Sequence, residues 1–116
     1  MNTSYFAKYK GDNGVCISLI TPSWFIGETY KKLAPKYFIL DNYRRGKINE
    51  EEYIELYYEH VLSKLDARKV YNELVSLVGS EDVVLLCFEK SDKFCHRHIV
   101  AKWFKDELGI DILELI

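Results

Sequence analysis

The sequence has no long apolar run, and this absence excludes one class of protein. No stretch approaches the roughly 20 consecutive apolar residues that a membrane-spanning helix needs. The first five residues are polar and lack the basic start and apolar stretch of a signal peptide. We therefore expect a cytoplasmic protein that does not bind a membrane.

Cysteine and net charge are also scarce. The chain has three cysteines, Cys16, Cys87 and Cys95, and an odd number argues against a structural disulfide framework. The formal net charge is −2, so no overall electrostatic attraction draws the protein to nucleic acid. The basic and aromatic segment around Arg44 leaves a local nucleic-acid patch open, although a solvated turn explains the same residues and is favoured.

What is present is the composition of a single globular domain. Hydrophobic residues make up 48% of the 116 residues and charged residues 29%, a balance typical of a folded chain. No repeat, low-complexity stretch or flexible linker divides the sequence. We therefore expect one domain over residues 1–116.

The first part of the chain gives weak signals of secondary structure. Residues 5–9 and 15–20 are expected to be extended. In the second of these segments, β-branched and apolar residues follow a turn signal. Residues 24–35 predict a short helix that stops before a proline. Residues 36–48 stay ambiguous between a short strand and a buried turn.

The middle of the chain predicts two amphipathic helices. Asn49 is a good N-cap, and Glu52 can complete a capping box. Asp66 can cap the second helix, and Gly79 stands where a left-handed residue ends it. The two helices bury residues at helical spacing, namely Ile54, Tyr57, Tyr58, Val61, Leu62 and Leu65, then Ala67, Val70, Tyr71, Leu74 and Val78.

The last third of the chain predicts a strand, a helix and a strand. Residues 83–88 are apolar without alternation, which is typical of a central strand covered on both faces. A helix is expected over about residues 95–108 and a last strand over residues 110–115. The βαβ order predicts an α/β fold: a small, mostly parallel sheet flanked by helices in a three-layer, Rossmann-like arrangement.

Five residues with reactive or charged side chains gather over eleven positions of this unit. Cys87 and Glu89 follow the buried strand, and ligands of parallel sheets bind beyond the carboxyl ends of the strands. Cys95, His96 and Arg97 begin the next helix, where the helix dipole and free N–H groups favour anions and thiolates. The segment therefore predicts an anion-binding site with a reactive thiol.

Each of these residues has a functional and a structural interpretation. We expect Cys95 to be the nucleophile, His96 or Glu89 to transfer protons, and Arg97 to hold the anion with two hydrogen bonds. Alternatively, Arg97 pairs with Glu89 to order the loop, and Cys87 fills a buried strand position. The other ligand-binding candidates are Cys87, Lys90, Trp24 and Arg44, although ordinary core is the favoured interpretation of Trp24.

A zinc site is the third interpretation of the same segment. Cys87, Cys95 and His96 are suitable ligand types, and Glu89 could be a fourth. Neighbouring helical residues project about 100° apart, however, which makes joint ligation by Cys95 and His96 awkward. We therefore expect no metal and no other cofactor.

The same motifs carry a resemblance to a known family. Cys87-Phe88-Glu89 and Cys95-His96-Arg97 resemble the core signature of the domain-of-unknown-function family 488, as do Lys32-Leu33-Ala34-Pro35 and Glu52-Tyr53 upstream. The resemblance covers the chain from about Thr21 onward. It implies a small bacterial or phage α/β protein and supplies no reaction.

Two hypotheses of different classes follow. In the first, the protein is an enzyme that acts on a small anionic ligand, phosphate-bearing or nucleotide-like, through Cys95. In the second, it is a non-catalytic binding module for a nucleotide, nucleic acid or a protein partner, with nucleic acid not favoured. Thiol reactivity separates the two hypotheses.

Overall fold

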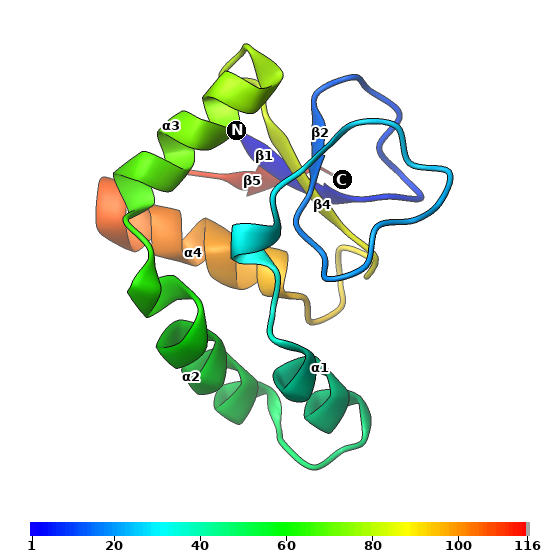
Figure 1. Cartoon of the computed structure of the whole chain (residues 1–116), viewed down its shortest axis with the longest axis vertical. Coiled ribbons are helices and arrows are strands. Elements are labelled where there is room, and N and C mark those ends of the chain that lie inside the picture. Colours follow the sequence, from blue (N-terminus) through cyan, green and yellow to red (C-terminus); the bar gives the residue numbers. More distant parts are fainter. Residues whose placement is uncertain (116) are drawn as a thin grey trace.

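A five-stranded sheet forms the centre of the computed structural model, which describes residues 1–115 (Figure 1). The strand order is β3-β2-β4-β1-β5, and every neighbouring pair is parallel. The strands are β1 (Asn2–Tyr5), β2 (Gly14–Cys16), β3 (Glu28–Thr29), β4 (Val84–Cys87) and β5 (Leu113–Glu114). Because the strands are parallel, their carboxyl ends meet at one edge of the sheet.

Helices account for most of the remaining chain. Within residues 1–115 the α-helices are α1 (Tyr37–Arg44), α2 (Glu50–His60), α3 (Ala67–Val78) and α4 (His96–Leu108). There are also two short 3₁₀ helices: η1 (Lys31–Leu33) precedes α1, and η2 (Leu62–Lys64) lies between α2 and α3. No helix in this part of the chain is long and apolar enough to cross a lipid bilayer.

The helix ends follow the predicted caps. The side chain of Asn49 accepts a hydrogen bond from the Glu52 N–H at 2.8 Å, and the Glu52 carboxylate accepts one from the Asn49 N–H at 3.1 Å, so the capping box of α2 is complete. Asp66 caps α3 in the same way, and Gly79 ends α3 in the left-handed conformation with φ of 78°. The predicted pair of helices with a break near Asp66 is therefore confirmed.

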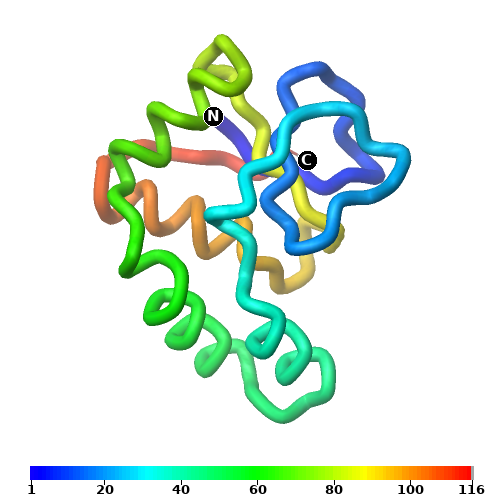
Figure 2. Tube along the Cα trace, in the orientation of Figure 1, coloured from blue at the N-terminus to red at the C-terminus, as the bar shows by residue number. Residues whose placement is uncertain are grey.

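Different parts of the chain cover the two faces of the sheet. The buried residues of all four α-helices pack on the face that carries Val15 and Leu85. The opposite face is covered by loop residues, namely Phe6, Tyr9 and Phe25, which pack on Cys16, Val84 and Leu86. The trace in Figure 2 shows the helical segments on the left and below, and the blue loops of residues 6–13 and 17–27 on the right. The predicted α/β fold with a parallel sheet is confirmed, and loops rather than helices form its third layer.

The helix predicted over residues 24–35 is wrong. This segment contains β3 and η1 instead, because β3 extends the sheet beside β2 and the Tyr30 N–H donates to the Cys16 carbonyl at 2.8 Å. Trp24 does not belong to a buried helix face: its side chain is 61% exposed and packs edge-on against Phe6.

Other boundaries also differ from the sequence prediction. The strand expected over residues 15–20 is β2, which ends at Cys16, and the strand expected over residues 110–115 is β5, which covers Leu113–Glu114 alone. The first strand spans Asn2–Tyr5 rather than residues 5–9, because the N–H groups of Lys8 and Tyr9 fold back onto the Tyr5 carbonyl. The ambiguous residues 36–48 form α1, which buries Ile39 and leaves Tyr37 and Phe38 largely exposed.

Candidate functional site

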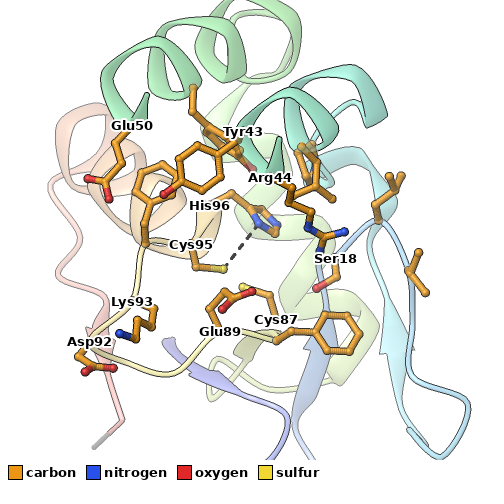
Figure 3. A pocket seen from close by; sticks show the side chains of 17 residues that line it. Ser18, Tyr43, Arg44, Glu50, Cys87, Glu89, Asp92, Lys93, Cys95 and His96 are labelled. Atoms are coloured by element: carbon orange, nitrogen blue, oxygen red, sulfur yellow. Dashed lines mark hydrogen bonds between the residues drawn. The ribbon is translucent and has the colours of Figure 1, made fainter. Parts of the chain in front are cut away.

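A pocket of about 530 Å³ opens at the carboxyl end of the sheet. Its floor is the end of β4 and the start of α4, and α1 and α2 supply its upper wall (Figure 3). Cys87, Cys95 and His96 all line it. The predicted location, beyond the end of the central strand, therefore coincides with the pocket.

The pleat of the sheet selects which cysteines reach the pocket. Successive side chains of a strand point to opposite faces. In β4, Leu85 packs with the helices and Leu86 with the loops, so Cys87 points to the helix side. Cys16 points to the loop side and is buried there with Leu86. Two of the three thiols can therefore meet, and Cys16 is excluded.

Cys95 is the N-cap of α4 and is not itself helical. Its backbone is extended, with φ of −155° and ψ of 147°, so its side chain turns back toward the sheet. As a result one ligand atom each of Cys87, Cys95 and His96 lie within 4.8 Å of one another. The angular argument against joint ligation by Cys95 and His96 is wrong, because it assumed that both residues are inside the helix.

A backbone carbonyl determines the tautomer of His96. Its Nε2 lies 2.8 Å from the Ile17 carbonyl oxygen, which can only accept a hydrogen bond, so Nε2 carries a proton. The other nitrogen, Nδ1, lies 3.8 Å from the Cys95 sulfur. Neutral His96 therefore presents a lone pair to the thiol, and protonated His96 donates to the thiolate.

The surroundings shift the pKa values of the two pocket thiols in opposite directions. Hydrogen bonding from Cys87, together with His96, lowers the pKa of the Cys95 thiol well below its ordinary value and outweighs the opposing effect of burial. Burial raises the pKa of Cys87, and its hydrogen bond to Cys95 adds to the rise. The surroundings therefore favour the thiolate at Cys95 over Cys87.

Arg97 is fully buried and does not line the pocket. Its Nε and one terminal nitrogen donate to the two carboxylate oxygens of Glu114, at 3.0 and 2.8 Å. The other terminal nitrogen lies 3.3 Å from the Cys87 sulfur. The pairing partner is thus Glu114 rather than the predicted Glu89.

Glu114 is the site residue that the sequence interpretation missed. Besides Arg97, it accepts hydrogen bonds from the hydroxyl groups of Thr3 and Ser91, each at 2.6 Å. Glu114 reaches Arg97 through the register of β1 against β5, which places Thr3 beside Glu114. The sequence contains no signal for that register, because β5 is short and far from the motif.

The remaining predicted residues divide between the pocket and its outside. Glu89 and Arg44 line the pocket, whereas Lys90 and Trp24 do not. Figure 3 shows the Glu89 carboxylate beside Cys87, and Arg44 near Ser18, on the side of the pocket opposite Lys93.

An aromatic wall completes the pocket. Tyr43, Tyr53 and Phe94 contact one another, with ring centroids 5.0 to 5.5 Å apart. The predicted buried stripe of α2 contained Tyr57 and Tyr58, and no tyrosine of this helix was predicted to line a site. The signal available was that Tyr53 belongs to the motif Glu52-Tyr53, outside the predicted stripe of buried residues.

These groups can perform two kinds of chemistry. A thiolate beside an imidazole is the arrangement of a nucleophilic cysteine. Two sulfurs and one imidazole nitrogen are also the ligand types of a soft metal ion such as zinc. Aromatic rings with Arg44 at one side suit a planar ligand that carries a negative charge.

Comparison with known proteins identifies a family. A family model described as "DUF488-N3a: Active DUF488-N3 subclade" matches residues 21–108. This segment holds the strand, loop and helix that form the floor of the pocket, and it agrees with the extent of the resemblance seen in the sequence. No curated protein and no solved structure matches the chain.

Proposed function

The chain belongs to the DUF488 family, and on this premise we propose that it is an enzyme that acts on a small phosphate-bearing or nucleotide-like ligand, with Cys95 as its reactive thiol. The ligand occupies the pocket of about 530 Å³ at the end of the sheet, a volume suited to a small molecule. Three free thiols, all buried, fit a reducing compartment, so we also propose a cytoplasmic location.

The observation that carries this proposal is the contact between Cys95 and His96. The Ile17 carbonyl holds one ring nitrogen of His96, and the other lies 3.8 Å from the Cys95 sulfur at the pocket floor. A nucleophile, a base and a group that orients the base are the three parts of an activated cysteine site. Here a backbone carbonyl does the orienting.

Other pocket residues have roles that follow from their positions. Glu89 is exposed at the pocket rim and can accept or return a proton from the ligand or from water. Arg44 lines the pocket and forms no ion pair with the described residues, so it can bind a phosphate or carboxylate. Arg97 acts through Cys87, whose sulfur it contacts, and is a positioning residue.

The charge of the lining restricts where an anion can bind. Glu50, Glu89 and Asp92 offset the charges of Arg44 and Lys93, so the pocket as a whole is not cationic. The negative group of the ligand is therefore placed beside Arg44 and the first turn of α4, where free N–H groups add to the attraction. The aromatic wall then receives the ring of a nucleotide-like ligand.

Thiol labelling tests this function. In chelator-treated protein we expect iodoacetamide to label Cys95 faster than Cys16 or Cys87, and inorganic phosphate or AMP to slow that labelling. We expect His96→Gln to move the pH midpoint of Cys95 labelling upward, because the imidazole stabilises the thiolate. His60→Gln, a surface histidine at the end of α2, is the matched control. Labelling is read for each cysteine by mass spectrometry.

The opposite labelling result would favour the second hypothesis, a non-catalytic binding module. If Cys95 labels no faster than Cys16 and neither phosphate nor AMP changes the rates, Cys95 is not a nucleophile. The pocket would then belong to a non-catalytic binding module.

A further inference from the structure

We propose that Cys87, Cys95 and His96 form a binding site for a soft divalent metal ion, Zn²⁺ above all, with a fourth coordination position open to the pocket. The proposal does not require Cys95 to be catalytic. It makes metal binding and attack by Cys95 alternative uses of one sulfur.

The spacing of the ligand atoms fits tetrahedral zinc. The two sulfurs and one imidazole nitrogen lie within 4.8 Å of one another. The Cys95 sulfur lies 3.8 Å from Nδ1 of His96. With Zn–S of about 2.3 Å and Zn–N of about 2.0 Å, a tetrahedral ion places sulfur and nitrogen roughly 3.5 Å apart. An ion can therefore enter with little movement of these two side chains.

Each ligand already has the kind of outer partner that metal ligands have. A metal-binding histidine usually donates its other ring N–H to a carboxylate or a backbone carbonyl. His96 does so, at 2.8 Å, to the carbonyl of Ile17. The Cys87 sulfur accepts from Arg97 at 3.3 Å. Cys95 stands at the N-terminal end of α4, where the helix dipole favours a thiolate.

The charges around the cluster also suit a divalent cation. Two thiolates with a neutral imidazole balance Zn²⁺, and Arg97 is already neutralised by its two hydrogen bonds to Glu114. No carboxylate of residues 1–115 belongs to the three-ligand group, so the hard cations Mg²⁺ and Ca²⁺ lack the oxygen ligands they need.

The fourth position distinguishes this site from a structural zinc site. Structural zinc is enclosed by four protein ligands, whereas a catalytic or regulatory ion keeps one position for water or a ligand. All three ligands here line the pocket, so the free position faces the space in which a small molecule would bind. A bound ion would meet that molecule directly and would shield Cys95 from alkylation.

Cobalt and zinc titrations of the full chain test the site. We expect one Co²⁺ per chain, with the thiolate charge-transfer bands and the strong visible bands of a tetrahedral ion, and displacement by Zn²⁺. Cys87→Ser should weaken zinc binding by about 100-fold or more, since loss of an outer partner alone costs roughly 10–100-fold. Cys16→Ser, a thiol on the opposite face of the sheet, should leave the titration unchanged.

A second measurement uses the unaltered protein, in case Cys87→Ser does not fold. Equimolar Zn²⁺ should slow iodoacetamide labelling of Cys95 and Cys87 and leave Cys16 unaffected, and a chelator should reverse the protection. The proposal is overturned if cobalt shows no thiolate bands, or if Zn²⁺ protects none of the cysteines. If Cys95 labels fast in chelator-treated protein and cobalt gives no thiolate bands, the metal-site proposal is wrong and the proposed nucleophile stands. If cobalt gives thiolate bands and Cys95 labels no faster than Cys16 in chelator-treated protein, the proposed nucleophile is wrong and the metal site stands.

Discussion

The guanidinium of Arg97 stands behind Cys87 because Glu114 holds it there. Burial opposes the charge on both partners, and two hydrogen bonds between them offset that cost. Glu114 is also held by the hydroxyl groups of Thr3 and Ser91, which tie β1 and the loop before α4 to the same carboxylate. One carboxylate thus fixes three parts of the chain around the site.

This arrangement predicts a pH dependence of stability. Burial alone would raise the pKa of Glu114, but hydrogen bonds from Arg97, Ser91 and Thr3 lower it from 4.5 to about 2. A lowered carboxylate pKa stabilises the fold above pH 4.5, and this contribution disappears as the pH falls toward 2. The side chain is 16% exposed, so after allowance for solvent screening we expect a loss of about 2–3 kcal/mol of unfolding free energy.

The measurement is urea unfolding between pH 5 and pH 2. Glu114→Gln should already be destabilised at pH 7, by roughly 3–5 kcal/mol, because Arg97 stays buried without a counter-charge. It should also lack this part of the acid-dependent loss. Glu55→Gln, an exposed carboxylate on α2, is the control and should behave like the unaltered chain. A Glu114→Gln variant with the unaltered pH profile would contradict this role of the pair.

Individual site residues were predictable where local chain geometry determines them. Cys87 follows a buried strand and Cys95 begins a helix, and both positions can be recognised in the sequence. The contact of Cys95 with His96 could not be predicted by counting helical angles, since an N-cap residue has extended backbone. The partner of Arg97 could not be predicted, because Glu114 is brought to it by the pairing of β1 with β5, two strands at opposite ends of the chain.

The capping box of α2 has an effect beyond its own helix. Asn49 and Glu52 satisfy each other's backbone N–H groups, and Glu50 and Tyr53 of the same first turn line the pocket. A frayed first turn would therefore loosen the pocket wall. The cap belongs to the site as much as to the helix.

We expect Asn49→Ala to cost about 1 kcal/mol of unfolding free energy, as N-cap substitutions commonly do. Asn49→Asp should retain most of the stability, because a carboxylate also accepts the hydrogen bond. Thermal and urea melts measure both variants. Equal stability of the alanine variant and the unaltered chain would show that the cap is not needed.

Helices and strands could be predicted where the local sequence has a clear apolar pattern or capping residues. Residues 83–108 contain a dense apolar strand and a helix ended by glycine, and both were located to within about two residues. Residues 24–35 were misassigned, because two paired residues of β3 decide their conformation and no local pattern reveals that pairing. The apolar start of α1 was ambiguous, since one buried residue, Ile39, is too little for a helical period.

The molecule as a whole has one large core on the helix side of the sheet and one small cluster on the loop side. Trp103 and Leu62 are buried in the large core, at 4% and 1% exposure, whereas Ile54 is 36% exposed although its spacing predicted a buried residue. The stability of the fold should therefore depend on α4 and η2 far more than on the outer side of α2.

Alanine substitutions measure this difference. Trp103→Ala and Leu62→Ala should each lower the unfolding free energy by roughly 2–5 kcal/mol, because each leaves a cavity. Ile54→Ala is the control, with an expected change of about 0.5 kcal/mol or less, typical of a surface position. Similar losses for all three variants in urea melts would contradict the one-sided core.

The strand order has a consequence for synthesis on the ribosome. β1 is made before the other strands, yet its partners among residues 1–115 are β4 and β5, and β2 pairs with β3 and β4. The segment of β1 therefore leaves the exit tunnel with its backbone groups unpaired and waits until more than 80 residues have followed it. Contacts this distant along the chain slow folding and leave strand edges open to misassembly. The nascent chain is thus a candidate client for chaperones until the Cys87 strand has been translated.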